Sequence, residues 1–300
     1  MNAATLLLHG AFMRKTARLT LLLTLFCMAT ATNPALALEQ VSGIRVYVLD
    51  CGSMAIRDMG LFSDTGAYQG HPGTIVDPCF LIRHPKGVLL WDTGLSDSIV
   101  GHDAPANADG VALHLERGLL AQLADLGVSP ADITYLAFSH LHIDHTGNAN
   151  AFGAATWILN QAEIDWALST PTPPIVDPST FSTFRSARTI MINGDYDVFG
   201  DGRVRILKTP GHTPGHQVLL LKLSRTGTVL LSGDLYHLRS DRPAHPGASA
   251  QMMPFNTSRA ETLASMDRVE GILHNAHARL IVQHDPDDFR GLPKSPAYLD

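Results

Sequence analysis

The sequence lacks several features that define other classes of protein. Cysteine is scarce, with three residues in a chain of 300, and no segment has a low-complexity or disordered composition. The apolar run near the N-terminus, residues 19–31, is shorter than the ~20 residues that a membrane-spanning helix needs. Because 45% of the residues are apolar and 17% are charged, we predict a globular protein with one large domain.

The N-terminal segment has the order of a secretory signal peptide. A basic stretch, Met13–Arg18, precedes the apolar run, and Ala35-Leu36-Ala37 forms a small-x-small cleavage site. We therefore predict a signal peptide over residues 1–37, a mature domain over residues 38–300, and a periplasmic or secreted protein. An uncleaved membrane anchor is the alternative. The position of the basic stretch leaves both Met1 and Met13 as candidate starts.

Charge and cysteine content limit the expected partners. Cleavage after Ala37 would change the formal net charge from −6 to −9, because it removes three basic residues and no acidic one. An acidic surface argues against nucleic acid and anionic membranes as partners.

Cys51 and Cys79 are the two cysteines of the predicted mature domain, and an oxidising compartment would allow a disulfide between them. A buried free thiol suits their apolar surroundings equally well, so the sequence leaves the pairing open, as it does the oligomeric state.

Hydrophobic patterns predict strands and helices that alternate along the chain. Leucines at helical spacing between Leu113 and Leu126 predict a helix, and a capping box at Ser258 and Glu261 predicts the start of another. The glycine-rich segment Asp58–Pro78 is expected to be a loop. Further runs predict strands at residues 44–49, 79–82, 87–91, 133–138, 156–159, 204–207, 216–223, 228–231 and 280–282, and a helix at residues 162–168. Two sheets with helices outside them fit this order.

One short segment contains an unusual concentration of metal-ligand residue types. His140, His142, Asp144 and His145 follow the predicted strand 133–138 within six positions. In an extended segment His140 and His142 share one side, whereas Asp144 and His145 can turn toward a second centre. Imidazole and carboxylate groups without thiolates suit zinc, iron, manganese or cobalt, and zinc is the default. The segment therefore predicts a site for two divalent metal ions.

This segment resembles the HxHxDH signature of the metallo-β-lactamase superfamily. Other motifs of that family follow in its order, at Leu90–Gly94, Thr209–His216, Ser232–Asp234 and Gln283–Asp285. The resemblance implies a hydrolase domain with an αββα four-layer sandwich fold. It assigns the first metal to His140, His142 and His212, the second to Asp144, His145 and His284, and a bridging position to Asp234. It also implies that Asp92 orients a ligand and that His216 is structural.

Three further features of the sequence are most similar to those of the N-acyl homoserine lactonase family. They are Ile192–Tyr196, the bridging Asp234 and the short region after His284. This resemblance implies that a hydroxide shared by the two metals attacks the lactone carbonyl and opens the ring. That family usually has a tyrosine three residues after the bridging aspartate, where this chain has His237.

Tyr236 comes one residue too early for that position, and neighbouring side chains of an extended segment point in opposite directions. Asp234, His237 and Tyr236 are therefore the candidate catalytic residues. The register favours His237 over Tyr236 as the residue that faces the metals, and Tyr236 is then a packing residue.

The expected partner is a small-molecule lactone or ester, without nucleic acid and without stable membrane insertion after signal cleavage. An acyl chain would need an apolar groove, for which Leu61–Tyr68 and Met252–Phe255 are candidates, although ordinary packing explains both segments equally well. The alternative functions are a glyoxalase II-like thioesterase, a broad lactonase or esterase and, less favoured, a β-lactamase. Residues 235–300 leave little room for the helical domain of glyoxalase II, and β-lactamases lack the bridging aspartate.

Overall fold

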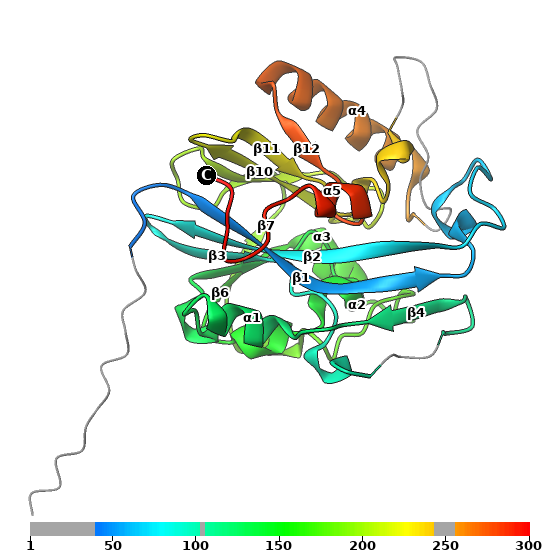
Figure 1. Cartoon of the computed structure of the whole chain (residues 1–300), viewed down its shortest axis with the longest axis horizontal. Coiled ribbons are helices and arrows are strands. Elements are labelled where there is room, and N and C mark those ends of the chain that lie inside the picture. The colour runs from blue at the N-terminus through cyan, green and yellow to red at the C-terminus, as the bar shows by residue number, and fades with distance from the viewer. Residues whose placement is uncertain (1–39, 103–105, 243–255) are drawn as a thin grey trace, which may run out of the picture. The chain divides into compact units, whose positions relative to one another are not determined.

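The first of two sheets contains seven strands in the order β4-β1-β2-β3-β5-β6-β7 (Figure 1). A computed structural model describes residues 40–102, 106–242 and 256–300. The strands of this sheet are β1 Arg45–Ile56, β2 Gly73–His84, β3 Gly87–Trp91, β4 Val111–His114, β5 Tyr135–Ala137, β6 Thr156–Asn160 and β7 Arg188–Ile192. The pairs from β4 to β3 are antiparallel and those from β3 to β7 are parallel.

The second sheet contains five strands in the order β12-β11-β10-β9-β8. They are β8 Tyr196–Asp197, β9 Val204–Lys208, β10 Gln217–Leu223, β11 Gly227–Leu231 and β12 Arg279–Ile281. Only the pair β11-β12 is parallel. The long helix α4, Arg259–Ala276, connects toward β12, and the Ser258 hydroxyl caps its start by accepting the Glu261 N–H.

The two sheets face each other across one apolar core. Alternate residues of each strand point inward, and this core includes Phe80, Trp91 and Ile158 from the first sheet and Leu219 and Val229 from the second. All five side chains are fully buried. Burial of this kind is the main favourable term in the folding free energy.

Helices cover the outer face of each sheet (Figure 1). Helices α1, Leu119–Asp125, and α3, Gln161–Ala167, pack through Leu123 and Ile164 on the first sheet, and α4 packs through Val269 on the second. Two short helices, α2 Ile143–Thr146 and α5 Pro286–Arg290, follow strand ends. The predicted αββα sandwich is confirmed. No helix within the three described ranges is long and apolar enough to cross a membrane.

Two predictions about local structure were wrong. The predicted helix from Leu113 to Leu126 is a strand followed by a short helix, because residues 111–114 pair with β1 as β4 and α1 begins only at Leu119. The predicted loop Asp58–Pro78 is shorter, because β2 begins at Gly73 and pairs with β1 from that residue on. The predicted signal peptide, residues 1–37, and the candidate groove segment Met252–Phe255 lie outside the described residues.

The structure resolves the question of the two cysteines. Cys51 of β1 and Cys79 of β2 form a disulfide, with their Cα atoms 5.7 Å apart. The bond joins two neighbouring antiparallel strands of the first sheet and closes a loop with a sequence separation of 28. A cross-link of this span stabilises a fold mainly by reducing the conformational entropy of the unfolded chain.

We expect the Cys51→Ser/Cys79→Ser double variant to lose about 2–4 kcal/mol of unfolding free energy. Urea denaturation of the mature protein, with and without a thiol reductant, measures this loss. Reductant should lower the midpoint of the wild type and leave the double variant unchanged. Equal midpoints for the oxidised wild type and the variant would contradict the stabilising role.

Candidate metal centre

The first group of candidate ligands gathers where β5 ends. Ring nitrogens of His140, His142 and His212 and a carboxylate oxygen of Asp234 all lie within 4.8 Å of one another. Nε2 of His212 is 3.2 Å from Nε2 of His140 and 3.2 Å from Nδ1 of His142, and Oδ2 of Asp234 is 3.4 Å from Nε2 of His212. Three nitrogens and one oxygen therefore converge on one point.

These imidazoles are suited to bind a cation through their lone pairs. Burial and the neighbouring imidazoles lower the pKa values of His140 and His142 well below the usual value. Burial lowers the pKa of His212 to about 4 against the opposing effect of Asp234. The three rings are therefore neutral near pH 7, which is the form that coordinates a metal.

The second group lies on the other side of Asp234. Ligand atoms of Asp144, His145 and His284 lie within 4.8 Å of one another. Oδ1 of Asp234 is 3.1 Å from Nε2 of His145 and 3.0 Å from Nε2 of His284. Asp234 thus presents one oxygen to each group, which is the arrangement of a bridging carboxylate.

The polar atoms of the second group suit a divalent cation. Among the described residues, Oδ1 of Asp144 is buried without a hydrogen-bond partner, and a buried polar atom in that state is costly. Burial acts to lower the pKa of His284, but Asp234 and Asp144 outweigh it and raise that pKa to about 9. The carboxylates therefore favour positive charge here, and the nitrogen and oxygen donors suit a divalent ion such as zinc, iron, manganese or cobalt.

The rings of three candidate ligands are held through their other nitrogen. Nδ1 of His212 lies 2.8 Å from the side-chain oxygen of Asn256, and Nδ1 of His284 lies 2.6 Å from the carbonyl oxygen of Val76. Nδ1 of His145 lies 3.2 Å from Oδ2 of Asp92. Such contacts fix the tautomer and the direction of each ring and leave Nε2 for a metal.

Asp92 stands at the end of β3 and connects several parts of the site. The residue is fully buried and has a φ of 59°, in the left-handed region that few residues other than glycine adopt. Its Oδ1 accepts the Ser139 N–H at 2.7 Å and its Oδ2 accepts the Gln283 side-chain N–H at 3.2 Å. Asp92 therefore lies where it can orient His145, as the resemblance implies.

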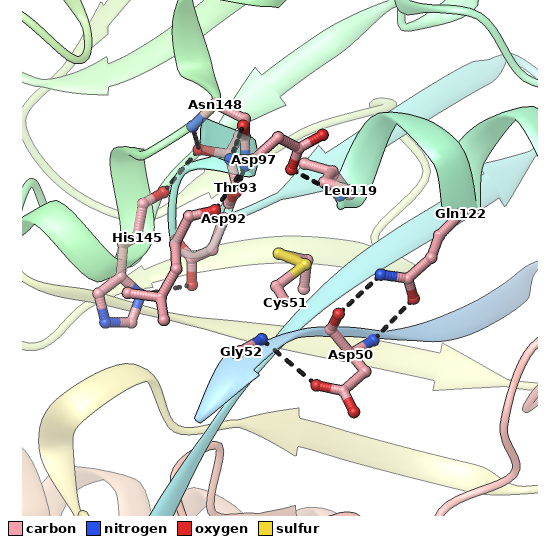
Figure 2. The surroundings of a disulfide bond; sticks show 12 residues. Asp50, Cys51, Gly52, Asp92, Thr93, Asp97, Leu119, Gln122, His145 and Asn148 are labelled. Carbon is pink, nitrogen blue, oxygen red and sulfur yellow. Dashed lines mark hydrogen bonds and ion pairs between the residues drawn. A yellow bond between two sulfur atoms is a disulfide. The ribbon is translucent and has the colours of Figure 1, made fainter. Parts of the chain in front are cut away.

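The disulfide lies beside the loop that follows Asp92 (Figure 2). In this loop the Thr93 N–H donates to the carbonyl oxygen of His145 at 2.8 Å. Gly94 has a φ of 64°, and a Cβ atom there would lie 2.2 Å from Cβ of Cys51. Glycine is therefore required at this position for the loop to pack between the disulfide and the second group of ligands.

Glu163 of α3 joins the two loops that carry the first group of ligands. Its carboxylate accepts the Leu141 N–H at 2.9 Å, the Thr213 hydroxyl at 2.7 Å and the Gly215 N–H at 2.9 Å. Burial raises the pKa of Glu163 to about 7, although all three hydrogen bonds lower it. No sequence pattern pointed to this residue, because a single glutamate in a short helix gives no local sign of burial.

His216 has both ring nitrogens engaged by the protein. Nδ1 lies 3.0 Å from the carbonyl oxygen of Thr209, and Nε2 accepts the Asp234 N–H at 2.9 Å. Neither nitrogen is available for a metal, and His216 is not part of either ligand group. Its contacts agree with the expected structural role, since it holds the backbone of the bridging residue.

Of the two candidate residues that follow Asp234, only His237 lies at the site. Nε2 of His237 lies 3.1 Å from Oδ2 of Asp234. Tyr236 points the other way and donates its hydroxyl hydrogen bond to Glu270 of α4 at 3.0 Å. Burial raises the pKa of Tyr236. The Tyr236 side chain therefore lies in the core beneath α4 and not beside the candidate ligands, and the catalytic role of His237 stays a prediction.

The candidate groove segment Leu61–Tyr68 lies near His237. The ring centroids of Phe62 and His237 are 5.0 Å apart. Phe62 is buried in a small apolar cluster with Met59 and Ile75. The Tyr68 hydroxyl donates to Asp241, whose other oxygen accepts the His237 N–H at 2.9 Å. The segment is therefore packed against the residue beside the metal centre.

Comparisons with known proteins give consistent results. A family model described as the metallo-beta-lactamase superfamily matches residues 76–272. The N-acyl homoserine lactonase AttM of Azorhizobium caulinodans is 31% identical over 87% of this chain and 100% of that protein. An N-acyl homoserine lactonase of a Bacillus species is 29% identical over 76% of this chain and 90% of that protein.

Solved structures share the fold. An N-acyl homoserine lactone hydrolase with the product N-hexanoyl-L-homoserine bound at its catalytic metal centre has a TM-score of 0.72 and 23% identity, over 85% of this chain and 98% of that one. AidC, described as a dizinc quorum-quenching lactonase, has a TM-score of 0.61 and 19% identity, over 87% of this chain and 97% of that one.

We expect Glu163→Gln to destabilise the metal-free protein by about 1–3 kcal/mol. The glutamine side chain has an NH₂ group in place of one carboxylate oxygen, and this group would face at least one of the three hydrogen-bond donors that now donate to Glu163. Chemical denaturation measures this change. Asp165→Asn, an exposed substitution on the same helix, is the control and should change stability little. A Glu163→Gln variant as stable as this control would contradict the role of Glu163 in joining the two loops.

Proposed function

The chain belongs to the metallo-β-lactamase superfamily and, within it, to the N-acyl homoserine lactonase family, and on this basis we propose that it is a metal-dependent hydrolase that opens the lactone ring of N-acyl homoserine lactones. The observation that carries the proposal is the placement of Asp234 between two groups of ligands. Oδ2 lies 3.4 Å from Nε2 of His212 and Oδ1 lies 3.0 Å from Nε2 of His284. This arrangement suits two ions that share one carboxylate.

The seven side chains that would hold the ions are His140, His142, Asp144, His145, His212, Asp234 and His284. A pair of divalent ions, when bound, supplies an activated water and polarises the carbonyl group of an ester. We propose zinc for both positions, since zinc is the default for imidazole and carboxylate ligands. The donor set also accommodates iron, cobalt or manganese.

His237 and Asp234 would take part in the proton transfer that the reaction requires. Ring opening leaves an alkoxide on the former ring oxygen, and this oxygen must gain a proton. Nε2 of His237 lies 3.1 Å from Oδ2 of Asp234, so His237 would donate a hydrogen bond to the substrate beside this carboxylate, while Asp234 would pass the proton lost by the attacking water to the former ring oxygen. A positioned acid or base of this kind contributes typically 10²–10⁴-fold in rate.

The acyl chain of the substrate would lie along Leu61–Tyr68. The contact between the rings of Phe62 and His237 supports this placement, since it puts an aromatic surface beside the residue that would face the lactone. Ligand pockets are mostly apolar with a few polar groups that fix orientation. A small-molecule lactone is therefore the proposed partner.

We also propose a periplasmic or secreted location. The disulfide between Cys51 and Cys79 supports it, because disulfides persist in oxidising compartments and are rare in the cytosol. The apolar run and small-x-small site of the N-terminal segment point the same way.

A substrate panel tests the proposed function. Purified mature protein loaded with zinc, cobalt or manganese is assayed with N-acyl homoserine lactones of several chain lengths, a glutathione thioester, a cephalosporin and a phosphodiester. We expect the lactones to have the highest kcat/KM. If another substrate is preferred, the lactonase proposal is wrong.

We expect His237→Ala to lower kcat/KM for lactones by about 10²-fold or more, because it removes the proposed hydrogen-bond donor. Tyr236→Phe is the matched control, since it removes only the hydroxyl that contacts Glu270, and its kcat/KM should remain near that of the wild type. Metal content is measured for both variants to separate loss of the donor from loss of an ion. A larger loss for Tyr236→Phe than for His237→Ala would reverse the assignment.

A further inference from the structure

Asp77 of β2 is a buried acid that no assigned role explains. The residue is 1% exposed, and neither carboxylate oxygen has a hydrogen-bond partner in the part of the chain that the structure describes. A carboxylate removed from water is strongly unfavourable unless a hydrogen bond or a positive charge compensates it. The residue therefore needs an explanation in terms of what it faces.

The backbone around Asp77 is shaped by an irregularity of the sheet. Asp50 pairs with Pro78 and Ser53 pairs with Val76, so Cys51 and Gly52 together stand opposite Asp77. Two residues opposite one define a β-bulge, which bends a strand and redirects side chains, and such bulges are frequent beside functional sites. The bulge thus lies at the point where β2 presents its buried acid.

Asp77 lies next to the second group of ligands. The preceding residue, Val76, donates its N–H to the carbonyl oxygen of His284 at 3.1 Å, and its own carbonyl oxygen lies 2.6 Å from Nδ1 of the same histidine. Strand β3 pairs with β2 only from Phe80 onward, so this edge of β2 is open to His284.

The charged groups with the largest effect on Asp77 belong to the metal centre or its support. They are His145, Asp144, His284 and Asp92. Two of these four groups are imidazoles and none is a lysine or arginine, so within this set the positive charge that could balance Asp77 is that of the imidazoles or of an ion between them. Asp77 is absent from the two sets of converging ligand atoms, which places it just outside the atoms that touch the ion.

From this burial, position and charge we propose that Asp77 is an additional carboxylate of the second metal site, which strengthens the binding of that divalent ion through its charge and through water between them. The inference rests on the proposed function only in requiring two metal positions. A neutral hydrophobic residue at position 77 would fill the same space without this contribution. Asp77 is thus a positioning residue for the ion and not one of the catalytic residues.

Metal titration of the mature protein tests the inference. The protein is stripped with a chelator, and Zn²⁺ binding is measured in competition with a chelating dye for the wild type, Asp77→Asn and Asp77→Val. We expect the first ion to bind equally in all three and the second to bind about 10–100-fold more weakly in both variants, as for other groups that support metal ligands. Asp50→Asn, which removes an exposed carboxylate opposite Pro78, is the matched control and should bind both ions like the wild type.

Thermal unfolding of the metal-free proteins gives a second readout. Asp77→Val should raise Tm, because it removes an unpartnered acid from the interior, whereas a residue kept only for packing would lower Tm when replaced. The inference is overturned if both variants bind the second ion as tightly as the wild type. A wild type that binds fewer than two ions would instead refute the two-metal basis of the proposed function, so the two failures are distinguishable.

Discussion

The position of Asp234 between two sets of imidazoles is the constraint on which the rest of the site depends. Its two oxygens point to different groups, so its backbone must be fixed. Nε2 of His216 accepts the Asp234 N–H, and the Gln283 side chain accepts the Gly233 N–H at 2.8 Å. A Cβ atom at Gly233, where φ is 51°, would lie 2.6 Å from Nε2 of His216. The glycine of the Ser-Gly-Asp segment is therefore a requirement of close approach.

The two sheets bring distant residues to the same place. Strands β3 and β5 are parallel, and so are β11 and β12. The carboxyl ends of parallel neighbours lie at the same edge, so Asp92 and His140 follow one pair while Asp234 and His284 follow the other. Glu163 then ties the His140 loop to the segment of His212. The catalytic side of the molecule is thus a set of strand ends held by buried hydrogen bonds.

Sequence patterns predicted the strands and helices whose own residues show a clear hydrophobic period. They failed for strands that depend on pairing with a segment far along the chain. Most strands of both sheets were predicted from runs and alternation, but β4, β7 and β8 were not. Leu113 matched a helical period by coincidence, and its place in β4 depends on pairing with residues 53–56 of β1. Gly73 and Thr74 resemble loop residues but lie in β2, because β1 offers them backbone partners. Pairing of this kind is invisible in a local window.

The sequence by itself determined the superfamily, the αββα order of elements and the candidate ligands, because the ligand-rich segments are short, local and close to strand ends. Only the tertiary structure placed His237 rather than Tyr236 beside Asp234, joined Cys51 to Cys79 and buried Asp77 beside the second group of ligands. Each of these outcomes depends on which distant segment packs against the residue. Periodicity specifies the face of an element on which a side chain lies, whereas burial and contact follow from how the elements pack.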